Sequence, residues 1–358
     1  MSEGNNLIMK KMEIKHSWSD LPLDIKNKLC NANIFYSGKY EKFERRRGNN
    51  CIYVYNDIAI IVIIIWRKLF FKWGEMPTEP FYYINVNNDE VESVERVFLD
   101  DVMKVTNHKE FYWLGASGTA AIFHAYPAKS TRIPFGNYIV DLSRDEEELF
   151  SALNGKCRNM IRRAERDGVE ISFGGKELLD KYIVVDKDTW ERSDMREHSQ
   201  TEYENYFDSF DNNSRIYIAE KDGVVQGGAI FIFNKEMSYY LYGASIRRPS
   251  PGALNLLQYR AMMDFKSEGV HFHNFVGCRI NEDPDSKYHG IQKFKGSFGG
   301  ELVEGYMFKD VDNSILYKLF VIAYRIKNRS ECMPKDIIDQ EIHKWRNINE
   351  EDRHFDIP

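Results

Sequence analysis

Two stretches of the chain alternate apolar runs with short polar interruptions in the same way. Residues 51–73, CIYVYNDIAIIVIIIWRKLFFKW, are interrupted first at Asn56-Asp57 and again at Arg67-Lys68. Residues 215–244, RIYIAEKDGVVQGGAIFIFNKEMSYYLYGA, are interrupted at Asp222-Gly223 and at Asn234-Lys235. Polar pairs such as Asp-Gly between apolar runs are the usual signal of a β-hairpin. Each stretch therefore predicts three antiparallel strands.

The surroundings of the two predicted meanders also match. Ile52-Tyr53-Val54 in the first corresponds to Ile216-Tyr217-Ile218 in the second. Each meander is followed by a segment with helical periodicity and then by a short apolar run, at residues 89–105 and 111–114 in the first half and 253–267 and 271–276 in the second. This order predicts an α+β fold with a duplicated domain. A chance likeness of two meanders is the alternative.

A strand and a long helix are predicted where the two halves join. Residues 138–142, YIVDL, read as the strand, and residues 143–167 read as the helix. Ser143 and Glu146 have the spacing of a capping box, and Gly168 follows as a helix stop. We therefore expect domains at residues 1–142 and 143–310, followed by a C-terminal helical segment at residues 311–358.

Composition limits the classes of function. The chain has 358 residues and a formal net charge of -6, so any nucleic-acid site has to be a local basic patch. Its five cysteines form no CxxC pair, which favours reduced thiols in the cytoplasm. The most apolar run, residues 58–66, is too short to span a membrane, and the first residues lack the apolar segment of a signal peptide. We expect a cytoplasmic protein.

The predicted helix at 143–167 carries a basic stripe. Arg158, Arg162 and Arg166 are spaced four residues apart, and Lys156 and Arg163 flank them. One interpretation is a binding surface for phosphate or an RNA backbone. The other is a solvated helix face, because acids near the start and bases near the end of a helix suit its dipole.

Common catalytic motifs are absent. The sequence has no P-loop, no GxSxG and no HExxH. His271 and His273 lie two apart on a predicted strand, but no second ligand pair accompanies them, so a structural role is favoured over a metal site. We expect no metal.

The segment HGIQKFKGSFGG, residues 289–300, has one interpretation from its own spacing and another when it is taken together with other stretches of the chain. By itself, the spacing of Phe294 and Phe298 indicates two core anchors on one helix face, with Lys295 in solvent. Together with three other stretches it resembles the second domain of the Fem family of non-ribosomal aminoacyltransferases, which build peptide cross-bridges on peptidoglycan precursors. Those stretches are YIVDL with the basic helix after it (138–164), YLYGA (240–244) and HNFVG (273–277).

The resemblance implies two tandem GNAT-like (acyl-CoA N-acyltransferase fold) domains with mixed, mostly antiparallel sheets. It implies an aminoacyl-tRNA donor, a small or lipid-linked amine as acceptor in a cell-envelope precursor, and no cofactor. Lys295 would act on the terminal ribose and phosphate of the RNA or on the developing negative charge, with Phe294 packed beside it. Tyr242 and Asn274 would lie at neighbouring strand ends. Arg158, Arg162 and Arg163 would guide the acceptor stem.

Several features depart from the family pattern. Asn274 stands where an acid is common, no passage of the first half matches the family's acceptor-binding residues, and no coiled-coil arm fits after residue 167. One alternative is an acyl-CoA N-acyltransferase acting on an amino sugar of a surface polysaccharide. The CoA-binding turn would be SIRRPSPGAL (245–254), where Pro249 and Pro251 remove amide donors. A second alternative is an inactive binding protein with this fold.

Residues 313–327 are amphipathic, with Lys318, Arg325 and Lys327 on the polar side. Such a helix could make a peripheral membrane contact near a lipid-linked acceptor. Packing against its own domain is the favoured interpretation, because amphipathic helices usually face a core.

Overall fold

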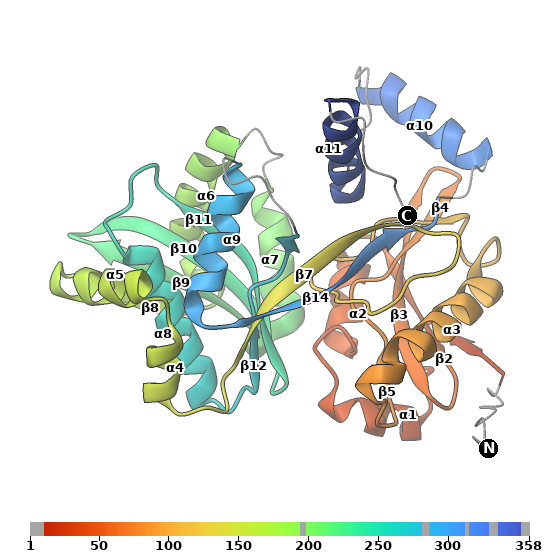
Figure 1. Ribbon diagram of the computed structural model, residues 1–358, viewed down its shortest axis with the longest axis horizontal. Coiled ribbons are helices and arrows are strands. Elements are labelled where there is room, and N and C mark those ends of the chain that lie inside the picture. Colours follow the sequence, from red (N-terminus) through yellow and green to blue (C-terminus); the bar gives the residue numbers. More distant parts are fainter. Residues whose placement is uncertain (1–10, 194–197, 281–285, 312–314, 329–335, 352–358) are drawn as a thin grey trace. The chain divides into compact units, whose positions relative to one another are not determined.

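The computed structural model describes residues 11–193, 198–280, 286–311, 315–328 and 336–351 (Figure 1). The chain forms two compact units. Unit 1 takes in Met1–Lys26, Gly48–Phe135 and Glu304–Pro358, and unit 2 takes in Asn27–Arg47 and Gly136–Val303. The predicted boundary near residue 142 is close to the passage at Gly136. The sequence did not indicate that residues 27–47 pack with unit 2 or that the chain returns to unit 1 after Val303.

Unit 1 is built on a sheet with the order β1-β2-β3-β4-β6, in which β5 also pairs with β3. These strands are β1 (Glu13–Lys15), β2 (Asn50–Tyr55), β3 (Ala59–Lys68), β4 (Phe71–Glu75), β5 (Phe81–Tyr82) and β6 (Trp113–Leu114). The unit's helices are α3 (Asn88–Thr106), α10 (Ile315–Asn328) and α11 (Ile337–Glu351), while the short helix α1 (Leu23–Lys28) has residues in both units. The apolar face of α3 packs on β3, whose isoleucine run is buried.

Unit 2 is built on a second sheet, with the order β13-β7-β12-β11-β10-β9-β8 and with β14 on β7. These strands are β7 (Thr131–Asp141), β8 (Glu170–Gly174), β9 (Ser214–Lys221), β10 (Val224–Phe233), β11 (Met237–Ser245), β12 (Phe272–Asn274), β13 (Cys278–Arg279) and β14 (Glu301–Lys309). Helices α4 (Glu146–Ala152), α5 (Gly155–Arg166) and α8 (Ala253–Ser267) pack on one face, and α6 (Leu179–Ser193) and α7 (Gln200–Phe210) pack on the other. Strands β7 and β14 each have residues in both units.

The repeat predicted from the sequence is present in the structure. Strands β2, β3 and β4 form an antiparallel meander, as do β9, β10 and β11. In each case a helix follows, and the next strand pairs in parallel with the last strand of the meander, β6 with β4 and β12 with β11. The turn of the second meander has Asp222 at φ 51° and Gly223 at φ 76°, as a tight hairpin requires. The α+β prediction is confirmed.

The single helix predicted at 143–167 is wrong. Asp145, not Ser143, caps α4 by accepting from the Glu148 amide, and the Glu148 side chain completes the capping box. The chain then leaves the helical conformation at Leu153, and Asn154 caps α5 by accepting from the Lys156 amide. Asn-Gly supplies a cap and a flexible residue in the middle of the apolar pattern, so one periodic segment becomes two helices. Gly168, at φ 76°, ends α5 as predicted.

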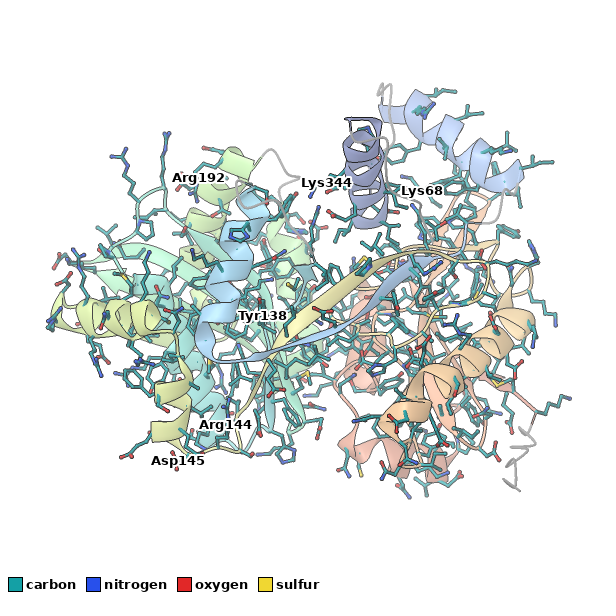
Figure 2. The ribbon with its side chains drawn as sticks, in the orientation of Figure 1. Lys68, Tyr138, Arg144, Asp145, Arg192 and Lys344 are labelled. Atoms are coloured by element: carbon teal, nitrogen blue, oxygen red, sulfur yellow. The ribbon has the colours of Figure 1, made fainter. Side chains whose placement is uncertain are left out.

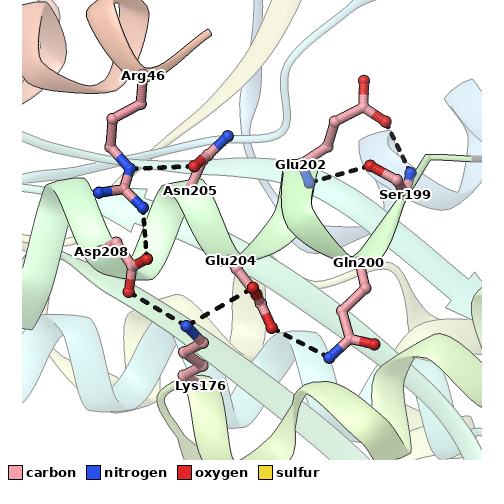
Figure 3. A network of polar contacts seen from close by, with 8 residues as sticks. All are labelled: Arg46, Lys176, Ser199, Gln200, Glu202, Glu204, Asn205 and Asp208. Atoms are coloured by element: carbon pink, nitrogen blue, oxygen red, sulfur yellow. Dashed lines mark hydrogen bonds and ion pairs between the residues drawn. The ribbon is translucent and has the colours of Figure 1, made fainter.

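The N-terminal helix α2 (Gly38–Arg46) packs on α7 within unit 2. The Phe43 ring lies 4.3 Å from the Tyr206 ring, centroid to centroid. Arg46 donates to Asn205 at 3.0 Å and to Asp208 at 2.7 Å, and Lys176 joins Asp208 to Glu204 (Figure 3). Residues far apart in the chain therefore share one interface.

The predicted C-terminal helical segment contains α10 and α11, shown in blue in Figure 1. Residues 312–314, 329–335 and 352–358 of that segment lie outside the described residues. Lys309 on β14 pairs with Asp336 and Asp339 at 2.7 Å each, which ties the start of α11 to the strand. None of the helices in the described ranges combines the length and apolar content that a membrane span requires.

Candidate functional site

The sheet of unit 2 opens where β11 and β12 separate. Their parallel pairing ends at Tyr239 and Asn274, while β11 continues to Ser245. The register of β11 with β10 shifts between Tyr240 and Tyr242, as in a β-bulge. A bulge re-aims the side chains that follow it and often lies beside a functional site. The end of β12, beside this bulge, is therefore a candidate functional site.

The chain makes a tight, left-handed turn immediately after β12. Val276 has φ 45° and Gly277 has φ 73°. A β-branched residue with positive φ is unusual and costs on the order of 1–3 kcal/mol. Two asparagine side chains hold the turn: Asn274 Oδ1 accepts from the Val276 amide at 2.7 Å, and Asn137 Oδ1 accepts from the Gly277 amide at 2.5 Å.

Lys295 holds the other side of the same turn. It lies in α9 (Lys287–Lys295), and its Nζ donates to the carbonyls of Val276 and Gly277, the latter at 2.9 Å. Burial lowers the pKa of Lys295 to about 8, against the opposing effect of the Cys278 thiol. An ammonium has three protons, and these carbonyls take two of them. The lysine is a partly buried anchor, not the solvent-facing residue that the local pattern alone predicted.

The segment around Lys295 is fixed by close packing. The 3-10 turn η4 (Gly296–Phe298) follows α9 directly, and a Cβ at Gly296 would lie 2.9 Å from the ring of Tyr138, labelled in Figure 2. The Phe298 ring stacks on Phe275 at 5.0 Å and meets the Phe294 ring edge-on at 5.1 Å. Phe294 and Phe298 are thus the core anchors that their spacing predicted, and they set the direction of the lysine.

Tyr242 lies in a different environment. It belongs to the apolar cluster under α6 and α7, whereas Phe294 packs against the cluster on the opposite face of the sheet. Its hydroxyl is 3.0 Å from that of Tyr206, and its ring also meets Tyr203 and His198. Burial raises the pKa of Tyr242. The structure therefore brings Asn274 and Lys295 together, but it packs Tyr242 into an aromatic cluster.

The three arginines predicted to guide RNA all make local contacts. Arg158 donates to the carbonyls of Ser151 and Leu153 at the end of α4, the former at 2.6 Å. Arg162 lies over the Phe150 ring, 5.2 Å from its centroid. Arg163 donates to Asp167 at 3.4 Å. Arg158 stabilises the break between the two helices, and the RNA contact stays a prediction.

The turn expected to bind CoA in the alternative function is closed at its centre. Gly252 caps α8 at φ 84°, and a Cβ there would lie 2.0 Å from the carbonyl oxygen of Met160 on α5. A carbonyl oxygen at a helix N-terminus disfavours a pyrophosphate there. Arg247 and Arg248 line an open surface depression nearby, together with Asp188 and Ile246.

The two histidines occupy unlike settings. His273 is fully buried, its Nδ1 lies 2.8 Å from the Ser238 hydroxyl, and burial lowers its pKa to about 3. His271 is exposed beside Glu236 at 3.2 Å. Within the described ranges, no three His, Cys, Asp or Glu side chains are grouped as metal ligands would be.

Sequence reasoning missed Asn137 and the turn at Val276-Gly277. Asn137 precedes the strand pattern YIVDL in the sequence and lies more than a hundred residues from Gly277, so no local signal joins the two. A glycine directly after the strand HNFV was the available hint of a left-handed turn.

Comparison with known proteins identifies relatives of this arrangement. The FemAB family model matches residues 124–223. The lipid II:glycine glycyltransferase of Staphylococcus haemolyticus is 22% identical over 249 residues, which cover 51% of this chain and 59% of that protein. The enzyme of the same name from Staphylococcus saprophyticus is 35% identical over 100 residues, which cover 27% of this chain and 24% of that protein. The matches thus span between about a quarter and three fifths of these relatives' length.

The fold likeness extends further than the sequence likeness. The crystal structure of FemX superposes with a TM-score of 0.64 at 15% identity, covering 86% of this chain and 99% of that one. The predicted fold class, two tandem GNAT-like domains of α+β type, is confirmed. Over residues 124–223 the chain is thus similar to the FemAB family, and over most of its length it has the fold of FemX.

Proposed function

We propose that this chain transfers an aminoacyl group from an aminoacyl-tRNA to an amine of a peptidoglycan precursor. The observation that carries the proposal is the Lys295 ammonium, held by two backbone carbonyls on a strained turn where β11 and β12 separate. The names of the staphylococcal relatives add support for a glycyl group and a lipid-linked acceptor.

The reaction needs little more than positioning and charge. The acceptor amine attacks the ester carbonyl carbon, and a tetrahedral intermediate with a negative oxygen forms. The bond to the ribose oxygen then breaks, and the proton of the amine passes to that oxygen. The third proton of Lys295 stabilises the negative oxygen or the neighbouring phosphate. A preorganised donor in a dry site is worth roughly 10²–10³ in rate.

Transfer assays with defined donors test this proposal. We expect the purified protein to move a radiolabelled glycyl group from tRNA to a lipid-linked muramyl pentapeptide, and RNase treatment of the donor to abolish the product. Transfer from acetyl-CoA without transfer from tRNA would instead establish the acyl-CoA alternative. Binding of the precursor with no transfer from either donor would establish an inactive binding protein.

A further inference from the structure

Helix α10 of unit 1 has two apolar faces, of which only one packs against residues that the structure describes. The inward face places Phe320 against Phe71, Trp73 and Trp113, with ring centroids 5.1 Å, 5.4 Å and 5.3 Å apart. The outward face exposes four aliphatic side chains, namely Ile315 (75% exposed), Leu319 (45%), Ile322 (51%) and Ile326 (75%). Their spacing of four, three and four residues places them in one stripe along the helix.

The hairpin between β3 and β4 adds to this apolar surface. Leu69 at its tip has φ 56° and is 87% exposed, and Phe70 beside it is 64% exposed. The tip lies against α10, since Lys68 Nζ is 5.6 Å from the centre of the Tyr324 ring (Lys68 is labelled below α10 in Figure 2). Two separate elements therefore present unpacked large apolar side chains next to each other.

The charged side chains of these two segments have one sign. The hairpin segment RKLFFK at 67–72 and the whole of α10 contain basic residues and no aspartate or glutamate, in a chain whose net charge is -6. Arg67 and Lys68 on the hairpin and Lys318 and Arg325 on α10 are exposed. A contiguous apolar surface rimmed by bases is rare on a soluble monomer and marks an interaction site.

We propose that α10 and the β3–β4 tip dock on the surface of an anionic lipid bilayer. An apolar stripe flanked by lysine and arginine fits a helix that lies in the headgroup region, where its aliphatic side chains enter the acyl boundary. The segments that flank the apolar stripe carry basic residues and no acidic ones, which suits the negative headgroups of anionic lipids. A second copy of the chain is a poorer occupant, because lysine is depleted at protein–protein interfaces. The proposal concerns binding by unit 1 alone and does not depend on the reaction that unit 2 performs.

Vesicle flotation of the full-length protein tests the proposal. The vesicles contain phosphatidylcholine alone or phosphatidylcholine mixed with phosphatidylglycerol. The first variant is the double substitution Ile322→Glu and Ile326→Glu on α10, and the second is Leu69→Ser and Phe70→Ser at the tip. Val184→Glu on α6 is the matched control, because Val184 is 64% exposed on a helix of unit 2. All these side chains are exposed, so thermal unfolding should stay at the wild-type value.

We expect the wild type to float with the anionic vesicles and to stay unbound with the neutral ones. Each double variant should lower the partition coefficient about tenfold or more, while Val184→Glu leaves it unchanged. Raising the salt concentration should also weaken binding, because the basic flanks are screened. Equal binding of wild type and double variants, or no binding of the wild type, would overturn the proposal. A dimer in light scattering that the α10 variant dissociates would assign the surface to a second copy instead.

Discussion

Asn274 and Lys295 hold the same turn from opposite sides, although they lie on different elements of unit 2. The asparagine oxygen accepts from the Val276 amide at 2.7 Å, and the lysine ammonium donates to the Val276 carbonyl. Val276 is thereby kept at a positive φ that a valine would otherwise avoid. The strand end, the lysine and the turn backbone are joined by these hydrogen bonds. A substitution of either residue should therefore alter the position of the other.

Asn274→Ala should loosen the turn. The substitution leaves the buried Val276 amide without its acceptor, which costs about 1–3 kcal/mol. We expect a lower free energy of unfolding in urea and a slower transfer rate. Asn274→Asp keeps an oxygen at the same place and should retain most of the stability. Wild-type stability of Asn274→Ala would show that the turn does not need this bond.

Two glycines of one segment should respond in opposite ways to alanine. Gly299 has φ 74°, and a Cβ there would lie 2.8 Å from the backbone of Ala152, so Gly299→Ala should destabilise the protein. Gly290 lies inside α9 and has open space within 4 Å of the position that a Cβ would take, so Gly290→Ala should raise helix stability by about 0.5–1 kcal/mol. Melting temperatures of the two variants measure the contrast. A similar shift for both would contradict the packing of residues 296–300.

Much of the fold could be predicted because its signals are local. Alternating apolar runs and an Asp-Gly turn predicted the second meander, and helical periodicity predicted α8. The role of Lys295 could not be predicted locally, since its partners are carbonyls at Val276 and Gly277 and carbonyls have no side-chain signature. The resemblance of FKGSFGG to a family motif singled the lysine out, but only the structure shows what it touches.

The interface between α2 and α7 could not be predicted from the sequence either. Phe43 and Tyr206 meet across more than 160 residues of chain. Because Phe43 is 3% exposed, Phe43→Ala should destabilise unit 2 by about 3–5 kcal/mol. Arg46→Ala removes partly exposed bonds to Asn205 and Asp208 and should cost about 1 kcal/mol or less. Hydrogen exchange of residues 38–46 should accelerate strongly in the first variant and weakly in the second. Unchanged exchange in both would place α2 outside unit 2.

Glu95 should make the stability of unit 1 depend on pH. It is fully buried, accepts from the Tyr82 hydroxyl at 3.0 Å and from the Ala125 amide at 2.9 Å, and burial raises its pKa to about 7 from an ordinary value of 4.5. The folded protein therefore holds a proton that the unfolded chain releases. The contribution of Glu95 to the free energy of unfolding is complete below about pH 4.5, and it is lost as the pH rises through 7.

The loss attributable to Glu95 is on the order of 3 kcal/mol. Urea unfolding at several pH values measures it, and Glu95→Gln should flatten the dependence in this window. Half-buried Glu79, whose pKa is also raised by desolvation, should leave a residual slope. The exposed Glu90→Gln variant should behave like the wild type. A Glu95→Gln profile that parallels the wild type would show that Glu95 is ionised in the folded protein.

The most direct test of the account is the rate of aminoacyl transfer by Lys295 variants across pH. Because the pKa of Lys295 is about 8, the wild-type rate should fall above that pH as the ammonium is lost. The permanently charged Lys295→Arg variant should show no such fall in its remaining activity. Lys295→Ala should be slowed by about 10²-fold or more while its near-ultraviolet circular dichroism stays at the wild-type signal. A Lys295→Ala protein with the wild-type rate and the wild-type pH profile would contradict the account.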